Sequence, residues 1–189
     1  MRKQRFANVI GFDDAPFPRT HRGSVKVVGA VFANHRLDGV LVGAIEKDGC
    51  DASEKLAALV KTSKFYQHAR LIMLQGITMG GFNVVDVFDL HRRLDLPILV
   101  VARYAPDMVA IRRALERHLK DGQAKWTLIE SLGDMEPAGN IYVQRVGLTP
   151  AQATEILAHW SIHSRIPEPL RCAHLIAGAL VTGQSRNRP

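Results

Sequence analysis

Acidic residues stand at two points where apolar runs end in this chain of 189 residues. Asp13 and Asp14 close the run that begins at Phe6, and Asp51 follows a later Val- and Ile-rich run. Carboxylates that lie close together repel each other, and protons or a bound cation relieve that repulsion. Because Mg²⁺ prefers oxygen ligands and often shares them with substrate phosphates, we expect Asp13, Asp14 and Asp51 to hold Mg²⁺ or Mn²⁺ for phosphoryl chemistry.

Two of these acids also have a structural interpretation. Asp51 begins Asp51-Ala-Ser-Glu54, which has the form of a capping box, and an N-cap role alone explains it. Asp14 is placed to stabilise the proline-rich turn that follows it. Asp13 is harder to explain structurally because it ends a buried strand, and we expect a functional role there.

A glycine-rich segment, 76–81, follows the next short apolar run. Its amides would bind an anion if the segment led into a helix N-terminus, and Asn83 is placed to cap such a helix. The segment has neither the Gly-Lys-Ser/Thr of a Walker A loop nor a GxGxxG pattern. Glycines that serve only a tight turn are the alternative. An enzyme that acts on a small phosphorylated molecule bound at this loop is therefore one functional hypothesis.

The order of the apolar runs predicts an α/β chain with a mixed sheet, in which ligands gather beyond the carboxyl ends of the strands. Two Val- and Ile-rich runs joined by a short polar loop, 24–32 and 39–46, predict an antiparallel hairpin. Later strands are expected at 70–74, 98–102, 126–129 and 141–143. Helices are expected from Asp51 onward, after Asn83, at 107–119, from Thr149-Pro150 onward and at 169–182.

Composition limits the class of protein. The net charge of +7 favours polyanionic partners such as nucleic acid. Only two cysteines occur, Cys50 and Cys172, and they give no disulfide framework and no zinc spacing. No run is apolar over the roughly 18 residues of a membrane helix, and the N-terminal run is too short for a signal peptide. We expect one cytoplasmic domain over 1–189 with a disordered tail at 184–189 and no membrane partner; the sequence leaves the oligomeric state open.

The C-terminal segment Arg165–His174 carries a resemblance to a known family. It reads Arg-Ile-Pro-Glu-Pro-Leu-Arg-Cys-Ala-His and resembles the Arg-Leu-Pro-Glu-Pro-Thr-Arg-x-Ala-Asp segment of endonuclease V. Ile10–Asp13 resembles that family's first strand with its catalytic aspartate, and Leu96–Arg103 and Tyr142–Leu148 are similar to two later segments.

A closer resemblance is to an uncharacterised, mostly archaeal family, the ninety-ninth domain of unknown function. The segments that carry it are Gly11–Asp14, Asp48–Ser53 and Gln75–Asn83, the last reading Gln-Gly-Ile-Thr-Met-Gly-Gly-Phe-Asn. The resemblance implies a ribonuclease-H-like three-layer fold, with a mixed β-sheet and helices on both faces, over the single endonuclease-V-like domain.

The resemblance also implies roles for individual residues. Asp13 matches the first metal-binding aspartate of endonuclease V, Asp51 lies near its glutamate, and Gln75 falls where that family has a second aspartate. These three are the expected catalytic residues. Gln75 and Asn83 would orient water or substrate. The residues expected to contact phosphates are Arg103, Arg165 and Arg171.

The departures from endonuclease V leave two functions open. Gln75 is neutral and a poorer ligand for a hard cation than aspartate, and the Pro-Tyr-Ile-Pro wedge of that family is missing. The leading hypothesis is an endonuclease-V-like nucleic-acid-processing protein that hydrolyses phosphodiesters with a divalent metal. The alternative is a non-catalytic nucleic-acid-binding module with the same fold and a degraded active site.

Overall fold

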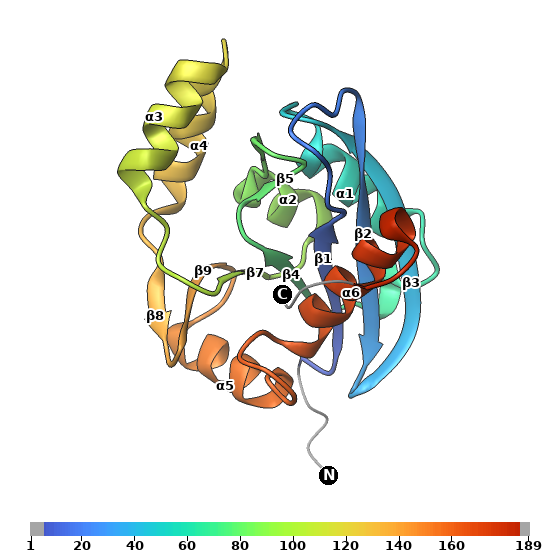
Figure 1. Ribbon diagram of the computed structural model, residues 1–189. Coiled ribbons are helices and arrows are strands. Elements are labelled where there is room, and N and C mark those ends of the chain that lie inside the picture. The colour runs from blue at the N-terminus through green and yellow to red at the C-terminus, as the bar shows by residue number, and fades with distance from the viewer. Residues whose placement is uncertain (1–5, 186–189) are drawn as a thin grey trace.

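A mixed sheet of seven strands forms the centre of the computed structural model, which describes residues 6–185 (Figure 1). The strand order is β3-β2-β1-β4-β7-β9-β8. The strands are β1 (Asn8–Asp14), β2 (Ser24–Ala33), β3 (Arg36–Glu46), β4 (Leu71–Gln75), β7 (Ile98–Ala102), β8 (Glu136–Ala138) and β9 (Ile141–Val146). Two further strands, β5 (Thr78–Met79) and β6 (Asn83–Val84), pair only with each other in a short hairpin. Most of the tail expected to be disordered, residues 186–189, lies outside the described range.

The helices fall close to the predicted segments, and one further helix, α4, lies between residues 119 and 149. They are α1 (Ala52–Lys61), the 3₁₀ turn η1 (Tyr66–His68), α2 (Val87–Leu94), α3 (Met108–His118), α4 (Gly122–Leu132), α5 (Pro150–Trp160) and α6 (Glu168–Thr182). The Thr149 side chain accepts from the Gln152 amide and begins α5 as a capping box, with Pro150 at its first position. The helix start expected at Thr149-Pro150 is confirmed.

The predicted hairpin is confirmed as β2 and β3, which pair antiparallel with Ser24 opposite Glu46. β1 continues this meander antiparallel to β2, and β4 and β7 then run parallel to β1. The central strands are apolar almost without interruption because both faces of the sheet are covered. Their carboxyl ends therefore meet at one edge of the sheet.

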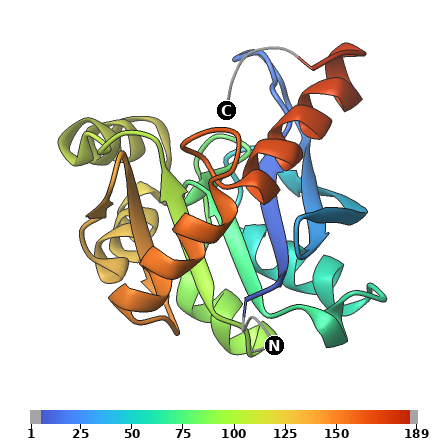
Figure 2. The same cartoon turned by 90° about the horizontal axis from the view of Figure 1, so that it is seen from below.

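Alternate residues of β1 face two separate cores. Ile10 packs in the core that includes Leu56 of α1 and Leu90 of α2. Val9 packs in the core that includes Leu170 of α6 and the α5 residues. Figures 1 and 2 show α5 and α6 together on one face of the sheet. Burial of these apolar side chains, at roughly 25 cal/mol per Å², is the main force that holds the three layers together.

Helix α6 approaches β1 most closely at Gly11. A Cβ placed on Gly11 would lie 2.6 Å from the backbone carbonyl carbon of Pro169, at the start of α6. Only glycine allows this approach without moving the helix. The next turn of α6 consequently lies over the carboxyl end of β1.

Helices α3 and α4 pack together and against the β5–β6 hairpin, away from the α6 side of the molecule (Figures 1 and 2). The strand expected at 126–129 is wrong, because these residues belong to α4. Trp126 and Ile129 are buried, three positions apart on one face of the helix, against Leu115 of α3. An apolar run of four residues does not by itself distinguish a strand from a buried helix segment.

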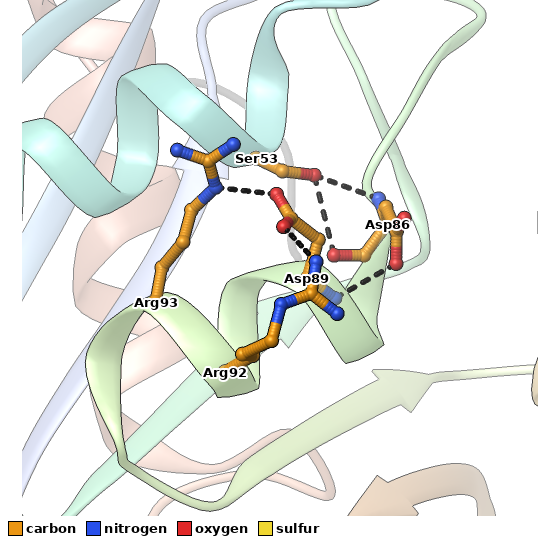
Figure 3. A network of polar contacts seen from close by, with 5 residues as sticks. All are labelled: Ser53, Asp86, Asp89, Arg92 and Arg93. Carbon is orange, nitrogen blue, oxygen red and sulfur yellow. Dashed lines mark hydrogen bonds and ion pairs between the residues drawn. The ribbon is translucent and has the colours of Figure 1, made fainter.

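On the face of the sheet opposite α5 and α6, polar contacts join α1 to the start of α2 (Figure 3). The Ser53 hydroxyl accepts from the Asp86 amide at 2.7 Å and donates to the Asp86 carbonyl. The Asp86 carboxylate accepts from the Asp89 amide and caps α2, and Asp89 pairs with Arg92 and Arg93. Both carboxylates are therefore occupied by structural contacts.

Candidate functional site

The carboxyl ends of β1 and β4 bring Asp13 and Gln75 side by side. The parallel register pairs Phe12 with Leu74, and Asp13 and Gln75 are the next residues along each strand. Neighbouring strands lie about 4.8 Å apart. Met73, two residues before Gln75, packs in the core on the α6 side, so by strand alternation the Gln75 side chain lies on the same face as Asp13.

Asp13 is buried, with 5% of its surface exposed, and its carboxylate is held from two sides. Its Oδ2 lies 2.8 Å from Nδ1 of His174 on α6, and its Oδ1 accepts from the Asp14 amide at 3.0 Å. Burial raises the pKa of Asp13, and the hydrogen bond to His174 opposes that shift. The same hydrogen bond raises the pKa of His174. Burial therefore disfavours the charged form of Asp13, while the contact with Asp13 favours the protonated form of His174.

The Gln75 side chain contributes an unsatisfied acceptor. Its Oε1 is buried and has no hydrogen-bond partner among residues 6–185. A buried polar atom without a partner costs roughly 1–3 kcal/mol, so such atoms are rare and call for an explanation. A ligand that arrives from outside the chain would satisfy it.

Asp14 points to the other face of β1 and binds the glycine-rich segment. Its Oδ2 accepts from the Gly80 amide at 2.9 Å. Burial and the nearby charge of Asp13 raise the pKa of Asp14 to about 6. Asp14 is thus ionised at neutral pH only at a cost to the folded state.

This cost predicts a pH-dependent effect of Asp14→Asn, because the amide oxygen can still accept from Gly80 but carries no charge. The folded state holds the Asp14 proton more tightly than the unfolded chain, so the wild type loses stability as pH rises from about 4 to about 6. Without divalent cations, the variant should exceed the wild type in free energy of unfolding by about 2 kcal/mol near pH 8 and by almost nothing near pH 4. Urea unfolding in EDTA at both pH values measures this difference.

The control for that experiment is Asp95→Asn, which alters an exposed aspartate at the end of α2. It should change the free energy of unfolding by less than about 0.5 kcal/mol at either pH. An Asp14→Asn variant that is less stable than the wild type near pH 8 would show that the Asp14 charge is favourable, contrary to the burial argument.

Asp51 lies in a different cluster, together with Asn83. Asp51 Oδ1 accepts from Asn83 Nδ2 at 2.7 Å and from the Glu46 amide at 3.1 Å, and it makes no cap hydrogen bond to α1. The capping box expected at Asp51 is therefore wrong. Asn83 Oδ1 instead accepts from the amide of Ala52, the first residue of α1.

The internal hydrogen bonds of Asn83 leave it little capacity for substrate. Its Nδ2 donates both to Asp51 and to the Glu46 carbonyl, and the residue is fully buried. The structure therefore does not support the expected role of Asn83 in orienting water or substrate. It also does not cap α2, whose N-cap is Asp86.

The glycine-rich segment does not lead into a helix, contrary to expectation. It forms the β5–β6 hairpin, and its amides already bind carboxylates of the chain: Gly80 binds Asp14, and the Phe82 amide donates to Asp48 Oδ1 at 2.8 Å. The anion site expected at this segment is not formed. The hypothesis of a small phosphorylated substrate loses the observation that motivated it.

The three expected phosphate-binding arginines lie in different settings. Arg171 forms a bidentate pair with the buried Glu168, with contacts of 2.6 and 2.8 Å, and this pair lowers the pKa of Glu168. Arg165 is exposed before α6. Arg103 follows β7, and its charge lowers the pKa of His174, so it lies near the Asp13–His174 pair. Of the three, Arg103 is the one that the structure brings to the site.

The structure does not bring the three expected metal ligands together. Among residues 6–185, no group of three or more His, Cys, Asp or Glu side chains is placed to hold a metal ion. Asp13 and Asp14 are adjacent in the chain, but Asp51 belongs to the Asn83 cluster. Asp13 and Gln75 lie on the same face at neighbouring strand ends, and their oxygen atoms are ligands of the kind that Mg²⁺ and Mn²⁺ accept, whereas the His174 ring is hydrogen-bonded to Asp13.

Sequence reasoning missed His174 as a site residue. The signal was present, because His174 closes the segment Arg165–His174 at the position where the resembling segment has aspartate. Its distance of 161 residues from Asp13 concealed the contact.

Among residues 6–185, no helix has the length and apolar character that crossing a membrane requires.

Comparison with protein families and curated proteins gives one consistent result. The family model described as endonuclease dU matches residues 5–181. A UPF0215 protein of Deinococcus radiodurans is 49% identical over 181 residues, which cover 96% of this chain and 92% of that protein.

Solved structures extend the likeness. A crystal structure of a protein of unknown function from Archaeoglobus fulgidus has a TM-score of 0.86 and 36% identity, over 93% of this chain and 99% of that one. Endonuclease V of Ciona intestinalis, in complex with DNA containing an inosine, has a TM-score of 0.58 and 14% identity, over 88% and 82% of the two chains. The expected ribonuclease-H-like α/β fold, with a mixed sheet between helices on both faces, is confirmed.

Proposed function

Because this chain belongs to the endonuclease dU family, which is related in structure to endonuclease V, we propose that it is a divalent-metal-dependent endonuclease acting on DNA that contains a deaminated base. The family's description points to deoxyuridine, the deaminated form of deoxycytidine, as the first substrate to test. The observation that carries the proposal is the unpartnered Gln75 oxygen beside the buried Asp13 carboxylate at one end of the sheet.

The residues at this end have complementary roles. Asp13 supplies the negative charge that attracts a cation, and Gln75 supplies a neutral oxygen beside it. A divalent cation bound there would polarise a phosphate and lower the pKa of an attacking water. His174 fixes the orientation of the Asp13 carboxylate through Nδ1, which leaves Nε2 as the ring nitrogen that can exchange a proton with water.

Arg103 completes the arrangement with a permanent positive charge near the pair. Guanidinium groups bind phosphate oxygens through paired hydrogen bonds, and such contacts position a nucleic acid strand. Asp51 and Asn83 have a structural role in this proposal, because together they join β6 to the start of α1.

The direct test is cleavage of end-labelled oligonucleotides that carry one deoxyuridine, one deoxyinosine or no modified base. Each is offered as single and double strands, and matching RNA is included, with Mg²⁺, Mn²⁺ or EDTA. We expect cleavage near the deaminated base with Mn²⁺ or Mg²⁺ and none with EDTA. Cleavage that persists in EDTA would contradict the metal-dependent proposal.

The non-catalytic alternative is favoured by one observation, that both Asp13 oxygens already accept hydrogen bonds from within the chain. A protein of this kind would bind nucleic acid with a strong salt dependence that metal does not alter. No cleavage of any oligonucleotide, together with such binding, would establish this function in place of hydrolysis.

A further inference from the structure

Tyr104 carries an exposed ring just beyond the carboxyl end of β7. Tyr104 follows Arg103 directly after β7, and 70% of its surface is exposed. No other Phe, Tyr or Trp side chain among residues 6–185 exposes this much surface. Its ring forms no aromatic contact within the same range.

The strand register fixes how near Tyr104 lies to the site. Val101 of β7 pairs with Gln75 of β4, and Tyr104 is three residues beyond Val101. Three extended residues span at most about 10 Å. The Tyr104 backbone therefore lies within about 10 Å of Val101, the residue that pairs with Gln75. A bound nucleic acid strand a few nucleotides long could contact both Tyr104 and Gln75.

Helix α3 begins just after this loop and exposes two arginines on one face. Val109, Arg113 and Arg117 are spaced four residues apart, and all three are exposed. At that spacing side chains lie on one face of a helix. Neither arginine makes an ion pair or side-chain hydrogen bond within residues 6–185, whereas Arg112 on the neighbouring face pairs with Glu116.

The helix that presents these arginines is held firmly in place. The Arg112 guanidinium lies over the ring of Trp126 in α4, 5.4 Å from its centre, and Leu115 is fully buried between α3 and α4. Asp107 caps the start of α3 by accepting from the Ala110 amide at 2.9 Å. The basic face therefore belongs to a helix whose position is fixed, and the loop that carries Tyr104 leads directly into this helix.

We propose that Tyr104 and the Arg113–Arg117 face of α3 form the surface that binds the nucleic acid strand, with Tyr104 stacking on one of its bases; this rests on the proposed function. An aromatic ring stacks on any base, and arginines beside it neutralise the phosphates that follow. The charge of the face and the exposure of the ring fit an unpaired strand better than a rigid duplex, whose bases are already stacked.

The test measures binding without cleavage. A short fluorescein-labelled single-stranded thymidine oligonucleotide is titrated in EDTA, and fluorescence anisotropy follows its binding. Tyr104→Ala should weaken binding about 10-fold, whereas Tyr104→Phe, which keeps the ring, should stay within about 2-fold of the wild type. Arg113→Gln combined with Arg117→Gln should lower the slope of log affinity against log salt by about 1 to 2.

The matched control is Arg36→Gln, which removes an exposed arginine from β3 at the opposite edge of the sheet. It should leave both affinity and salt slope unchanged. Absence of strand binding by the wild type, wild-type affinity for Tyr104→Ala, or an equal loss for Tyr104→Phe would each overturn the proposal. EDTA prevents metal-dependent cleavage during the binding measurement, so binding and cleavage are tested separately. If the protein binds the strand through Tyr104 but cleaves no substrate when metal is present, only the proposed function is contradicted.

Discussion

Asp13→Asn is expected to lower the rate of DNA cleavage at least about 100-fold while the protein remains folded. The substitution keeps the size of the side chain and removes its charge. That charge is what would hold a divalent cation beside the Gln75 oxygen, and it also keeps the His174 ring protonated more readily than an isolated histidine. The substitution removes both the charge that would hold the cation and the charge that favours protonated His174, so the expected loss of cleavage rate is large.

Three measurements separate this role from a structural one. Cleavage of the deoxyuridine oligonucleotide gives the rate, calorimetry with Mn²⁺ gives the affinity for the cation, and NMR titration gives the pKa of His174. All three should fall in Asp13→Asn and remain unchanged in Asp95→Asn, which removes a charge from an exposed position. Full cleavage by Asp13→Asn would end the case for catalysis at this carboxylate.

Gly11→Ala is expected to destabilise the protein by about 2 kcal/mol and to loosen the site at the same time. The added methyl group would lie 2.6 Å from the Pro169 backbone, closer than atoms in a folded protein approach. Helix α6 must therefore shift away from β1, and it carries His174 with it. The hydrogen bond between His174 and Asp13 should lengthen, and the pKa of His174 should fall toward its ordinary value.

Urea unfolding and NMR titration of His174 measure the two parts of this prediction. The control is Gly43→Ala on β3, where an added methyl group would meet side chains and no backbone: the flexible end of Leu59 at 3.0 Å and Val27 Cγ2 at 3.4 Å. That variant should be less destabilised and should leave the pKa of His174 unchanged. A Gly11→Ala protein as stable as the wild type would show that α6 tolerates a wider separation from the sheet.

The strands were the most predictable part of the fold. The β2–β3 hairpin, β4, β7 and β9 follow from apolar runs bounded by turn residues, since both faces of the sheet are covered. The segment 126–129 failed because four residues carry no reliable period, and its burial against Leu115 is a tertiary property. Local sequence cannot show which surface a short apolar run will meet.

The site was predicted in part. Asp13 and Gln75 were identified as site residues, and the strand register places them side by side. Asp51 matched a capping box, but its carboxylate is bound to Asn83, which lies 32 residues away in sequence. His174 was missed because its partner is 161 residues distant, and spacing rules describe only groups on one element.

The pairing of Asp13 with His174 also has a consequence for biosynthesis. Within residues 6–185, β1 is the first strand along the chain and α6 is the last helix. Asp13 and His174 can meet only after the 160 residues between them have been made, and closing so long a loop is slow compared with forming local contacts. A chain that ends before α6 would therefore lack the paired Asp13 and His174 side chains.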